Sequence, residues 1–499
     1  MVRNKSYSDF MNDISSDELY KGLLANGLFT EKLPPIFTSE KFFDYCENKS
    51  PSFPKKPAGF IYYESMRNVN IPRSLGIPNP AAYQILCKYL SKIWSQIRKF
   101  IELETNGEGH IISRIHLRKM KDSNSLFQMN YSNWKSDGTP VPDLLMGKKY
   151  VVHADISNFF PSIYTHALSW ALIGKNDAKQ NQTRSQWYNE LDLYTRNIKN
   201  GETHGLLIGP HVSNLLSEII MIKIDKVLYE RGWRYIRNID DYSCYVSSYE
   251  EAQLFLTELS QQLRAYDLTL NYKKTSINSL PKVALEKWVR DIKTASKLHV
   301  VKIMDFSGIS TFIDMAIELM QDNHDNAAIL YYTMKVVAKK RLTKNARSYY
   351  IKTIFHLVYI YPYLISQLEK YVFKPFGVKK KMIKDFSNSI YEEGLKLKNY
   401  EMVCFAIYYS IKYEFDIKKL DINSAKESNH CLFLLLSYLY YKKRKNKNVI
   451  KIYKEHAKTL RKIDSESYWL FIYEVLPQED LKDYWKAMKK NRVSFIIEV

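Results

Sequence analysis

The sequence predicts an α+β amino-terminal half followed by an all-α carboxyl-terminal half. The first half mixes short runs of alternating apolar residues with glycine turns and helical repeats. After about residue 295, glycine and strand signals nearly vanish, and amphipathic helical segments follow one another. We therefore expect an amino-terminal arm, a mixed domain and a helical domain, over residues 1–60, 61–290 and 291–499.

The bulk composition is that of a folded protein with a basic balance. With 499 residues, the chain is too long for one ordinary hydrophobic core. Its 74 Lys and Arg residues exceed its 53 Asp and Glu residues, which gives a formal net charge of +21. A phosphate-backbone partner favours this sign. A lysine-rich surface that serves solubility is an equally good explanation.

The cysteines and the apolar runs indicate a reducing, membrane-free setting. The five cysteines are scattered and never form a CxxC pair, which argues against a disulfide framework and a zinc site. The first twenty residues lack the uninterrupted apolar core of a signal peptide. The longest apolar runs, such as CLFLLLSYLYY, are too short to span a bilayer. We expect a cytoplasmic protein.

Local patterns predict the order of elements in the first two parts of the chain. Proline punctuation over residues 1–60 predicts an irregular arm that lies over the body. Apolar residues at helical spacing predict a helix at about 81–103. Further on, we expect a buried strand, a surface connection, a glycine turn with a long helix, two short strands, a helix and a last strand pair, at 148–156, 174–190, 205–230, 232–248, 252–266 and 268–277.

The last 200 residues or so carry tyrosine- and lysine-rich amphipathic segments such as NAAILYYTMKVVAKKRL and MVCFAIYYSIKYEF. Stacked helical hairpins bury such faces in the most direct way. No fixed repeat period is visible, so the prediction of a HEAT-like helical domain depends on this stacking argument.

Three aspartates suggest the chemistry. Asp155 ends a predicted strand, and Asp240 and Asp241 lie side by side in RYIRNIDDYSCYV, although strands are depleted in Asp. Clustered carboxylates repel one another unless a cation lies between them, and oxygen-only ligation selects Mg²⁺ or Mn²⁺. Two such ions can clamp both oxygens of a phosphoryl transfer. For a lone Asp-Asp pair, a solvated β-turn is the alternative explanation.

The context of these acids resembles that of reverse transcriptases. DISNFFPSI, HGLLIGPHVSNLLSE, the Asp-Asp hairpin and LTLNYKKT occur in one order along the chain. The palm of those enzymes carries an acid-led motif, a glycine-rich turn, an Asp-Asp hairpin and a strand that ends in Asn and Lys. The resemblance implies the fingers and palm of a right-hand polymerase, with Mg²⁺ (or Mn²⁺) as cofactor and dNTPs as substrates.

By position, the resemblance assigns roles to particular residues. The catalytic and metal-binding acids would be Asp155, Asp240 and Asp241. Phe160 would lie beneath the incoming sugar and select deoxynucleotides. The other nucleotide-binding positions would be Gly209, Lys274, Arg114 and Arg118. The alternatives are a core phenylalanine, an ordinary glycine turn and solvated basic side chains.

Two positions depart from the reverse transcriptase pattern. Asn238 stands where an aromatic residue usually precedes the Asp pair, and Ile208 stands where a Gln usually precedes the second glycine. Those positions help to seat primer and template in ordinary reverse transcriptases. Their loss argues against conventional template copying and leaves the metal chemistry intact.

Other segments resemble the bacterial abortive-infection reverse-transcriptase-like polymerases. They are RNVNIPRSLGIPNPAAYQIL, GLLIGPHVSNLLSEI, YWLFIYEVLP and NRVSFI. The resemblance implies a bacterial or prophage-encoded homo-oligomer that acts in phage defence. It also implies DNA synthesis without a template, primed by a tyrosine, with a single-stranded product attached to protein. With 39 tyrosines in the chain, composition does not identify the priming residue.

Two other functions are compatible with the sequence. One is a templated RNA-directed DNA polymerase of the retron-like or defence-associated kind, against which Asn238 and Ile208 count. The other is an inactive nucleic-acid-binding scaffold that keeps the palm only as a fold. Retention of three clustered acids argues against the scaffold, because such acids are costly to bury without a function.

Overall fold

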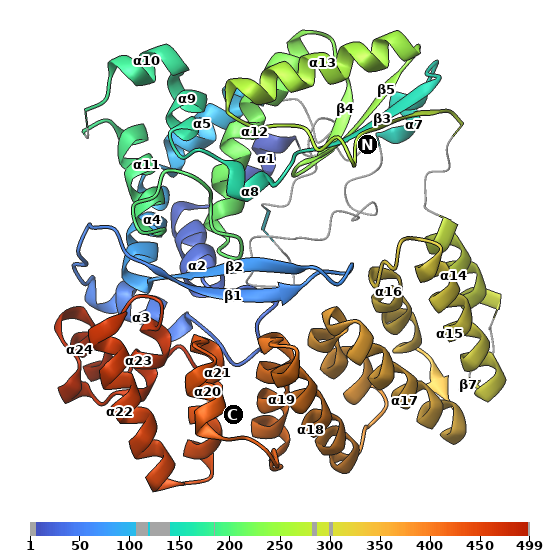
Figure 1. Cartoon of the computed structure of the whole chain (residues 1–499). Coiled ribbons are helices and arrows are strands. Elements are labelled where there is room, and N and C mark those ends of the chain that lie inside the picture. Colours follow the sequence, from blue (N-terminus) through green and yellow to red (C-terminus); the bar gives the residue numbers. More distant parts are fainter. Residues whose placement is uncertain are drawn as a thin grey trace.

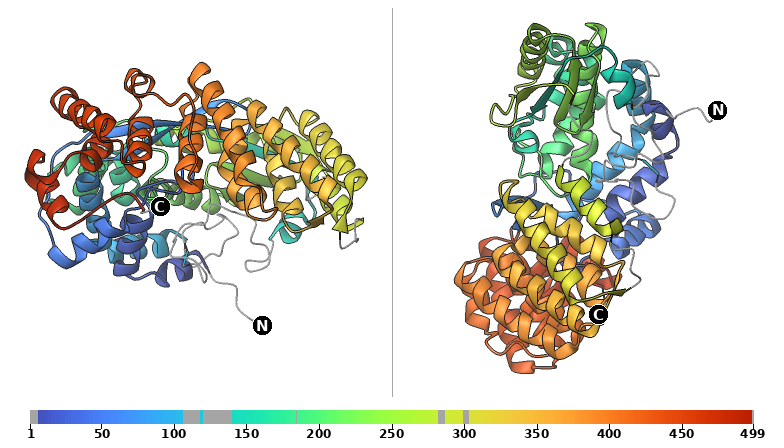
Figure 2. Two further views of the ribbon diagram at one scale, coloured as in Figure 1. Left: turned by 90° about the horizontal axis from the view of Figure 1, so that it is seen from below. Right: turned by 90° about the vertical axis from the view of Figure 1, so that its right-hand side faces the viewer.

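The computed structural model describes residues 6–105, 118–119, 140–183, 185–281, 287–298 and 303–497. Its amino-terminal part holds the main sheet and the helices around it, and its carboxyl-terminal part is an arc of helices (Figure 1). Seen from the side, the two parts are stacked one above the other (Figure 2).

The central sheet of the described residues is four-stranded and antiparallel, in the order β4-β5-β3-β6. Its strands are β3 (Tyr150–Asp155), β4 (Tyr235–Asn238), β5 (Asp241–Val246) and β6 (Ser276–Ser279). Helix α13 (Tyr249–Ala265) packs on β3 and β5, and the long helix α12 (Val212–Glu230) packs on α13. The predicted buried strand, the hairpin around the acidic pair and both helices are confirmed. The predicted last strand pair is present as β6 and a single bridge between Ile156 and Leu270.

Smaller helices surround this sheet. They are α1 (Tyr7–Asn12), α2 (Ser16–Asn26), α3 (Glu40–Lys49), α4 (Pro80–Lys92), α5 (Trp94–Thr105), α7 (Val141–Leu145), α8 (Phe159–Ser162), α9 (Ala167–Ile173), α10 (Lys175–Gln180) and α11 (Trp187–Asn197). The predicted helix at 81–103 is therefore two helices that meet at Ile93. The predicted surface connection contains α10 and the start of α11.

The prediction of an irregular amino-terminal arm is wrong where the chain forms α1, α2 and α3, whereas residues 27–39 between α2 and α3 are irregular. Helices α1 and α2 begin with capping boxes, in which Ser6 pairs with Asp9 and Ser15 pairs with Glu18. Each serine accepts a hydrogen bond from the backbone of the acid three residues later, and each acid bonds back to the serine backbone. The two Ser-x-x-acid patterns are the sequence signal that the proline punctuation obscured.

The carboxyl-terminal part is helical, as predicted. Its helices are α14 (Lys287–Leu298), α15 (Phe306–Gln321), α16 (Ala328–Val337), α17 (Lys344–Ile360), α18 (Lys380–Lys396), α19 (Tyr400–Tyr413), α20 (Ile422–Glu427), α21 (Cys431–Lys443), α22 (Lys447–Ile463), α23 (Trp469–Val475) and α24 (Asp483–Lys490). Short helical turns η1 (Pro362–Gln367), η2 (Glu369–Phe373) and η3 (Gln478–Asp480) and the two-residue strands β7 (Ile303–Met304) and β8 (Arg341–Leu342) connect them. Helix α18 packs on α19, α19 on α21, and α21 on α23, which is a stacked arrangement.

A β-hairpin joins the two parts. Its strands β1 (Phe60–Met66) and β2 (Pro72–Pro78) run across the molecule between them (Figure 1). Strand β1 packs on α19, α21 and α23 of the helical part. On the other side, the Gly76 amide donates a hydrogen bond to the Ile208 carbonyl at 2.9 Å. The hairpin therefore contacts both the helical part and the glycine-rich segment.

A buried acid fixes β1 to the helical part. Glu401 of α19 accepts hydrogen bonds from the Ser65 hydroxyl and the Met66 amide, each at 2.7 Å. Burial raises the pKa of Glu401 to about 7. At the other end of the chain, the Thr38 amide donates to the Phe495 carbonyl, which ties the carboxyl-terminal segment to the amino-terminal one.

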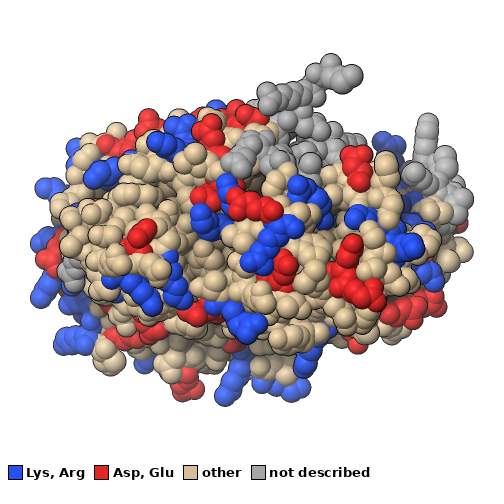
Figure 3. Space-filling view, turned by 90° about the horizontal axis from the view of Figure 1, so that it is seen from above, with Lys and Arg blue, Asp and Glu red and all other residues tan. Residues whose placement is uncertain are grey.

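The surface and the cysteines agree with the compositional analysis. All five cysteines are buried and unpaired. None of the described helices is long and apolar enough to cross a membrane. On the face drawn in Figure 3, basic and acidic side chains are interspersed, so the excess positive charge does not form one uniform patch there.

Candidate active site

The three predicted acids lie together at one end of the central sheet. Asp155 ends β3 directly opposite Asp241, the first residue of β5, and the Ile156 amide donates to the Asp240 carbonyl at 3.2 Å. All three aspartates line one cavity of about 630 Å³. Residues distant in the sequence are therefore brought together by the antiparallel pairing of β3 and β5.

The acids repel one another, and the pKa values of Asp240 and Asp241 are raised as a result of burial and this repulsion. Burial, followed by the charge of Asp155, raises the pKa of Asp240 to about 6. Burial, followed by the charge of Asp240 and a hydrogen bond with Asp155, raises the pKa of Asp241 to about 7. An excess of negative charge in a partly buried site favours a bound cation.

Asp155 already has polar partners on the protein. Its carboxylate accepts a hydrogen bond from the Asn271 amide at 2.9 Å and pairs with the Lys274 ammonium at 2.8 Å. Among the residues described, no group of three or more His, Cys, Asp or Glu side chains is arranged to hold a metal ion. The oxygen-only donor set and the mutual repulsion nevertheless fit Mg²⁺ or Mn²⁺, which would compete with Lys274 for Asp155.

The turn that presents Asp240 is strained. Ile239 and Asp240 form the two-residue turn between Asn238 and Asp241, and Ile239 has a φ of +57°. A β-branched residue in the left-handed region costs about 1–3 kcal/mol, and hairpin turns usually place glycine or asparagine there. Arg237 offsets part of this cost, because its guanidinium donates a hydrogen bond to the Ile239 carbonyl at 2.8 Å.

Arg237 belongs to a buried ionic cluster behind this turn. Its guanidinium is 0% exposed and pairs with Glu218 at 2.6 Å and with Asp225 at 2.7 Å, both from α12. The Tyr235 hydroxyl donates to Asp225 at 2.8 Å. Every carboxylate oxygen of this cluster accepts a hydrogen bond from the protein. The cluster therefore anchors the acidic hairpin to α12.

Phe160 lines the same cavity, whereas the predicted glycine, Gly209, does not. Phe160 is half-buried, contacts Phe159 with ring centroids 5.2 Å apart, and lines the cavity with Asp155. Gly209 has a φ of +125°, and a Cβ there would lie 3.3 Å from the Gly76 carbonyl oxygen. Gly209 is not among the cavity-lining residues, so in this structure it serves the packing of the glycine-rich segment on β2.

The basic residues of the cavity differ in part from those predicted. Lys274 lines it, but Arg118 is buried elsewhere with its guanidinium 4.8 Å from the centre of the Phe10 ring. Arg114 lies outside the described residues. Arg67 and Arg73, at the turn end of the β1–β2 hairpin, line the cavity instead, and the charge of Arg73 lowers the pKa of Asp240. The available sequence signal was the two arginines that flank NVNIP in RNVNIPR.

The two positions that depart from the reverse transcriptase pattern are both in the cavity wall. Ile208 and Asn238 line the cavity next to the acids. The side-chain oxygen of Asn238 is buried, and no described residue donates a hydrogen bond to it. The unusual residues are thus placed where they can act on a ligand.

A comparison with protein families matches residues 83–309 to the family described as reverse transcriptase (RNA-dependent DNA polymerase). The matched segment contains the three acids and Phe160, Gly209 and Lys274. The matched segment is less than half of the chain and is similar to a reverse transcriptase domain. Such domains are nucleotidyltransferases, namely DNA polymerases of the reverse transcriptase type.

Solved structures similar to the chain include three of Candida telomerase. The apo enzyme of Candida tropicalis is 13% identical, with a TM-score of 0.31, over 81% of this chain and 70% of that one. Its form truncated from the carboxyl-terminal domain is 14% identical, with a TM-score of 0.29, over 48% and 55%. Telomerase of Candida albicans with a fragment of telomeric RNA is 10% identical, with a TM-score of 0.28, over 79% and 65%. The chain thus spans about half the length of the truncated enzyme. No curated protein sequence matches it.

Proposed function

We propose that the reverse transcriptase domain makes DNA without a template, from a tyrosine primer, as part of abortive-infection defence in the bacterial cytoplasm. The observation that carries the polymerase assignment is the meeting of Asp155, Asp240 and Asp241 in one cavity with basic side chains. In the proposal, these aspartates hold Mg²⁺, which would activate the attacking hydroxyl and stabilise the charge on the leaving oxygen.

The other residues of the cavity receive roles in nucleotide binding. Arg67, Arg73 and Lys274 supply positive charge that suits a triphosphate. Phe160 lies beside Asp155, where its ring can exclude a 2′-hydroxyl and so favour dNTPs over rNTPs. The attacking hydroxyl forms a new bond to the α-phosphorus, and pyrophosphate leaves from the other side.

Template independence is supported by Asn238 and Ile208. These residues replace an aromatic residue and a glutamine that seat primer and template in ordinary reverse transcriptases. The sequence segments shared with abortive-infection polymerases support the same assignment, together with a homo-oligomeric state. In the proposal, the helical part guides a single-stranded product, since stacking on aromatic side chains needs no base sequence.

The direct test is synthesis without any nucleic acid added. Purified protein with Mg²⁺ and dNTPs is expected to yield DNA that stays with the protein after denaturation and is released by protease. Light scattering on the same sample measures the oligomeric state. DNA synthesis that requires an added primer and template would overturn the template-independent mechanism.

A templated RNA-directed polymerase is the second candidate. The description of the matched family, an RNA-dependent DNA polymerase, favours it. The same assay with an RNA template and a DNA primer separates the two candidates, because only templated synthesis yields a product complementary to the RNA.

The priming tyrosine is open to mass spectrometry. In the described part of the chain, Tyr62 is the tyrosine that lines the cavity, and its hydroxyl donates to Glu64 at 2.6 Å. It is therefore the first position to examine for a nucleotide adduct. An adduct on another tyrosine would leave protein priming intact and transfer the role to that residue.

A further inference from the structure

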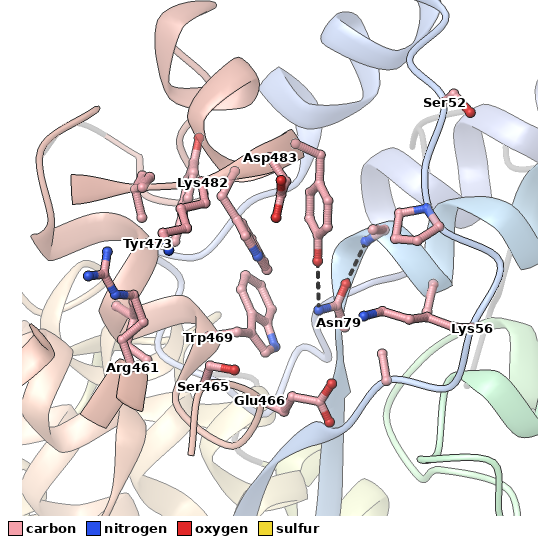
Figure 4. A pocket seen from close by; sticks show the side chains of 18 residues that line it. Ser52, Lys56, Asn79, Arg461, Ser465, Glu466, Trp469, Tyr473, Lys482 and Asp483 are labelled. Atoms are coloured by element: carbon pink, nitrogen blue, oxygen red, sulfur yellow. Dashed lines mark hydrogen bonds between the residues drawn. The ribbon is translucent and has the colours of Figure 1, made fainter. Parts of the chain in front are cut away.

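A second cavity of about 550 Å³ shares no lining residue with the first (Figure 4). One wall comes from the segment before β1 and the start of α4, including Lys56 and Asn79. The opposite wall comes from α22, α23 and α24. The volume lies in the range of pockets for small molecules, about 300–1,000 Å³.

Aromatic rings form much of this cavity. Trp469 is buried, and its ring stacks on that of the half-buried Trp485 with centroids 5.9 Å apart and planes 23° apart. Trp485 also contacts Tyr484, with centroids 4.7 Å apart. The Trp469 indole donates to the Ile77 carbonyl at 3.4 Å, which fixes its ring. Rigid aromatic faces at the edge of a cavity suit a planar ring of a ligand.

Basic side chains accompany the aromatic rings. Arg461 and Lys482 lie on the same side of the cavity in Figure 4. One terminal nitrogen of Arg461 is buried, and the described residues offer it no hydrogen-bond acceptor. A buried donor without a partner is unfavourable, and a guanidinium binds phosphate and carboxylate groups well. The cavity therefore has a site for an anion next to its aromatic rings.

Two acids, Glu466 and Asp483, also line the cavity (Figure 4), and among the described residues neither forms an ion pair with Arg461. The Glu466 carboxylate instead accepts a hydrogen bond from the Gly59 amide at 2.6 Å. Asn79 is also engaged, since its side-chain oxygen caps α4 at Ala81 and its amide donates to the Tyr484 hydroxyl. These contacts hold the two walls together and leave the guanidinium of Arg461 for a ligand.

We propose that this second cavity binds a nucleotide. The base packs against the aromatic cluster of Trp469, Tyr484 and Trp485, and the phosphate pairs with Arg461 and Lys482. The nucleotide is either a free one or one residue of a single-stranded DNA, because both offer the same base and phosphate. The site is separate from the polymerase site and does not depend on the function proposed for that site.

Tryptophan fluorescence of the full-length protein in EDTA tests the proposal. We expect saturable quenching by dAMP and by the oligonucleotide (dA)6, and binding of deoxyadenosine about tenfold weaker than that of dAMP, because it lacks the phosphate. Arg461→Met should weaken dAMP binding about tenfold. The exposed Lys482→Met serves as a second variant and should also weaken it, which covers the case in which Arg461→Met fails to fold.

Two controls locate the binding. Lys462→Met removes an exposed charge from α22, the helix that carries Arg461. Lys274→Met removes a charge from the polymerase cavity. Both should bind dAMP as the unmodified protein does. Tighter binding of (dA)6 than of dAMP assigns the site to a DNA strand, and equal binding assigns it to a free nucleotide. The proposal fails if neither ligand quenches the fluorescence, or if Arg461→Met and Lys482→Met bind dAMP unchanged.

Discussion

Acidic side chains on the two faces of the β4–β5 hairpin differ in their partners: those behind it are paired with a cation, and those in front lie beside other acids. Behind the hairpin, Glu218 and Asp225 pair with Arg237, and all their carboxylate oxygens accept hydrogen bonds. In front, burial and then the neighbouring carboxylates raise the pKa values of Asp240 and Asp241, and Asp155 beside them is one more acceptor. Arg237, which pairs with the rear acids, lies only two residues before the turn that presents the front acids.

This difference in partners distinguishes acids with a structural role from acids with a functional role. A carboxylate that is fully hydrogen-bonded to the protein has no capacity left for a ligand and serves to hold an element in place. A group of carboxylates that repel one another destabilises the fold and persists where a cation or substrate uses it. The rear cluster therefore positions the hairpin, and the front cluster is the part that we assign to chemistry.

The largest expected effect follows from neutralising the front cluster. The double substitution Asp240→Asn, Asp241→Asn should lower DNA synthesis at least about a thousandfold, because metal ions contribute several kcal/mol to phosphoryl transfer. Incorporation of labelled dNTPs measures the loss. Asp267→Asn, an exposed change of the same chemistry, is the control and should retain synthesis. Synthesis by the double variant would remove the polymerase assignment, and phage protection that survives the loss of synthesis would favour the inactive scaffold.

The next effect concerns the rear cluster. Arg237→Met leaves Glu218 and Asp225 buried without their cation, which should destabilise the protein by about 3–5 kcal/mol. Thermal unfolding and urea unfolding measure the change. The matched control is Arg234→Met, at the residue that precedes β4. Because Arg234 is exposed, its substitution should change the stability little. Equal stability of the two variants would show that the ionic cluster does not hold the hairpin.

The sequence was sufficient to single out the three acids that the structure brings together, because their residue types are chemically unusual in strands. Two adjacent aspartates in a strand and a third at a strand end stand out, because strands rarely carry them. The hairpin, β3, α12 and α13 follow from alternation and helical spacing, which survive in this part of the chain because each element has one buried face.

Other features depend on contacts that sequence patterns do not record. Arg73 lines the cavity only because the β1–β2 hairpin crosses between the two parts of the molecule. Arg237 reads as one more basic residue, although it is wholly buried against two acids of α12. The amino-terminal helices were obscured by prolines that lie between and after them, at Pro34, Pro35 and Pro51.

Glu401 sharpens the comparison, because it is buried with neutral donors instead of a paired cation. Its pKa is raised to about 7, so the folded state favours the protonated form. Its contribution to stability is full below the unfolded pKa of about 4.5 and is lost as the pH rises to about 7, which amounts to about 3 kcal/mol. In Glu401→Gln, the amide oxygen can accept from the Met66 amide while the amide nitrogen donates to the Ser65 hydroxyl, and the variant should remove this pH dependence.

Urea unfolding at pH 5 and pH 8 measures the effect of Glu401→Gln. The unmodified protein should lose more stability between these pH values than the variant does. The control is Glu427→Gln, an exposed acid in α20, which should behave as the unmodified protein. If Glu401→Gln and the unmodified protein show the same pH dependence, the Glu401 carboxyl does not titrate in this range.

The smallest effect is a gain of stability at the site itself. Asp241 has a pKa raised to about 7, so without metal its charge destabilises the fold at pH 8 and not at pH 4. After allowance for solvent screening, Asp241→Asn should raise the melting temperature in EDTA at pH 8 by about 2 °C, with less change at pH 5. Mg²⁺ should then stabilise the unmodified protein more than the variant. A variant that melts below the unmodified protein at pH 8 in EDTA would mean that Asp241 is held by structural contacts, and the contrast between the two faces of the hairpin would no longer hold.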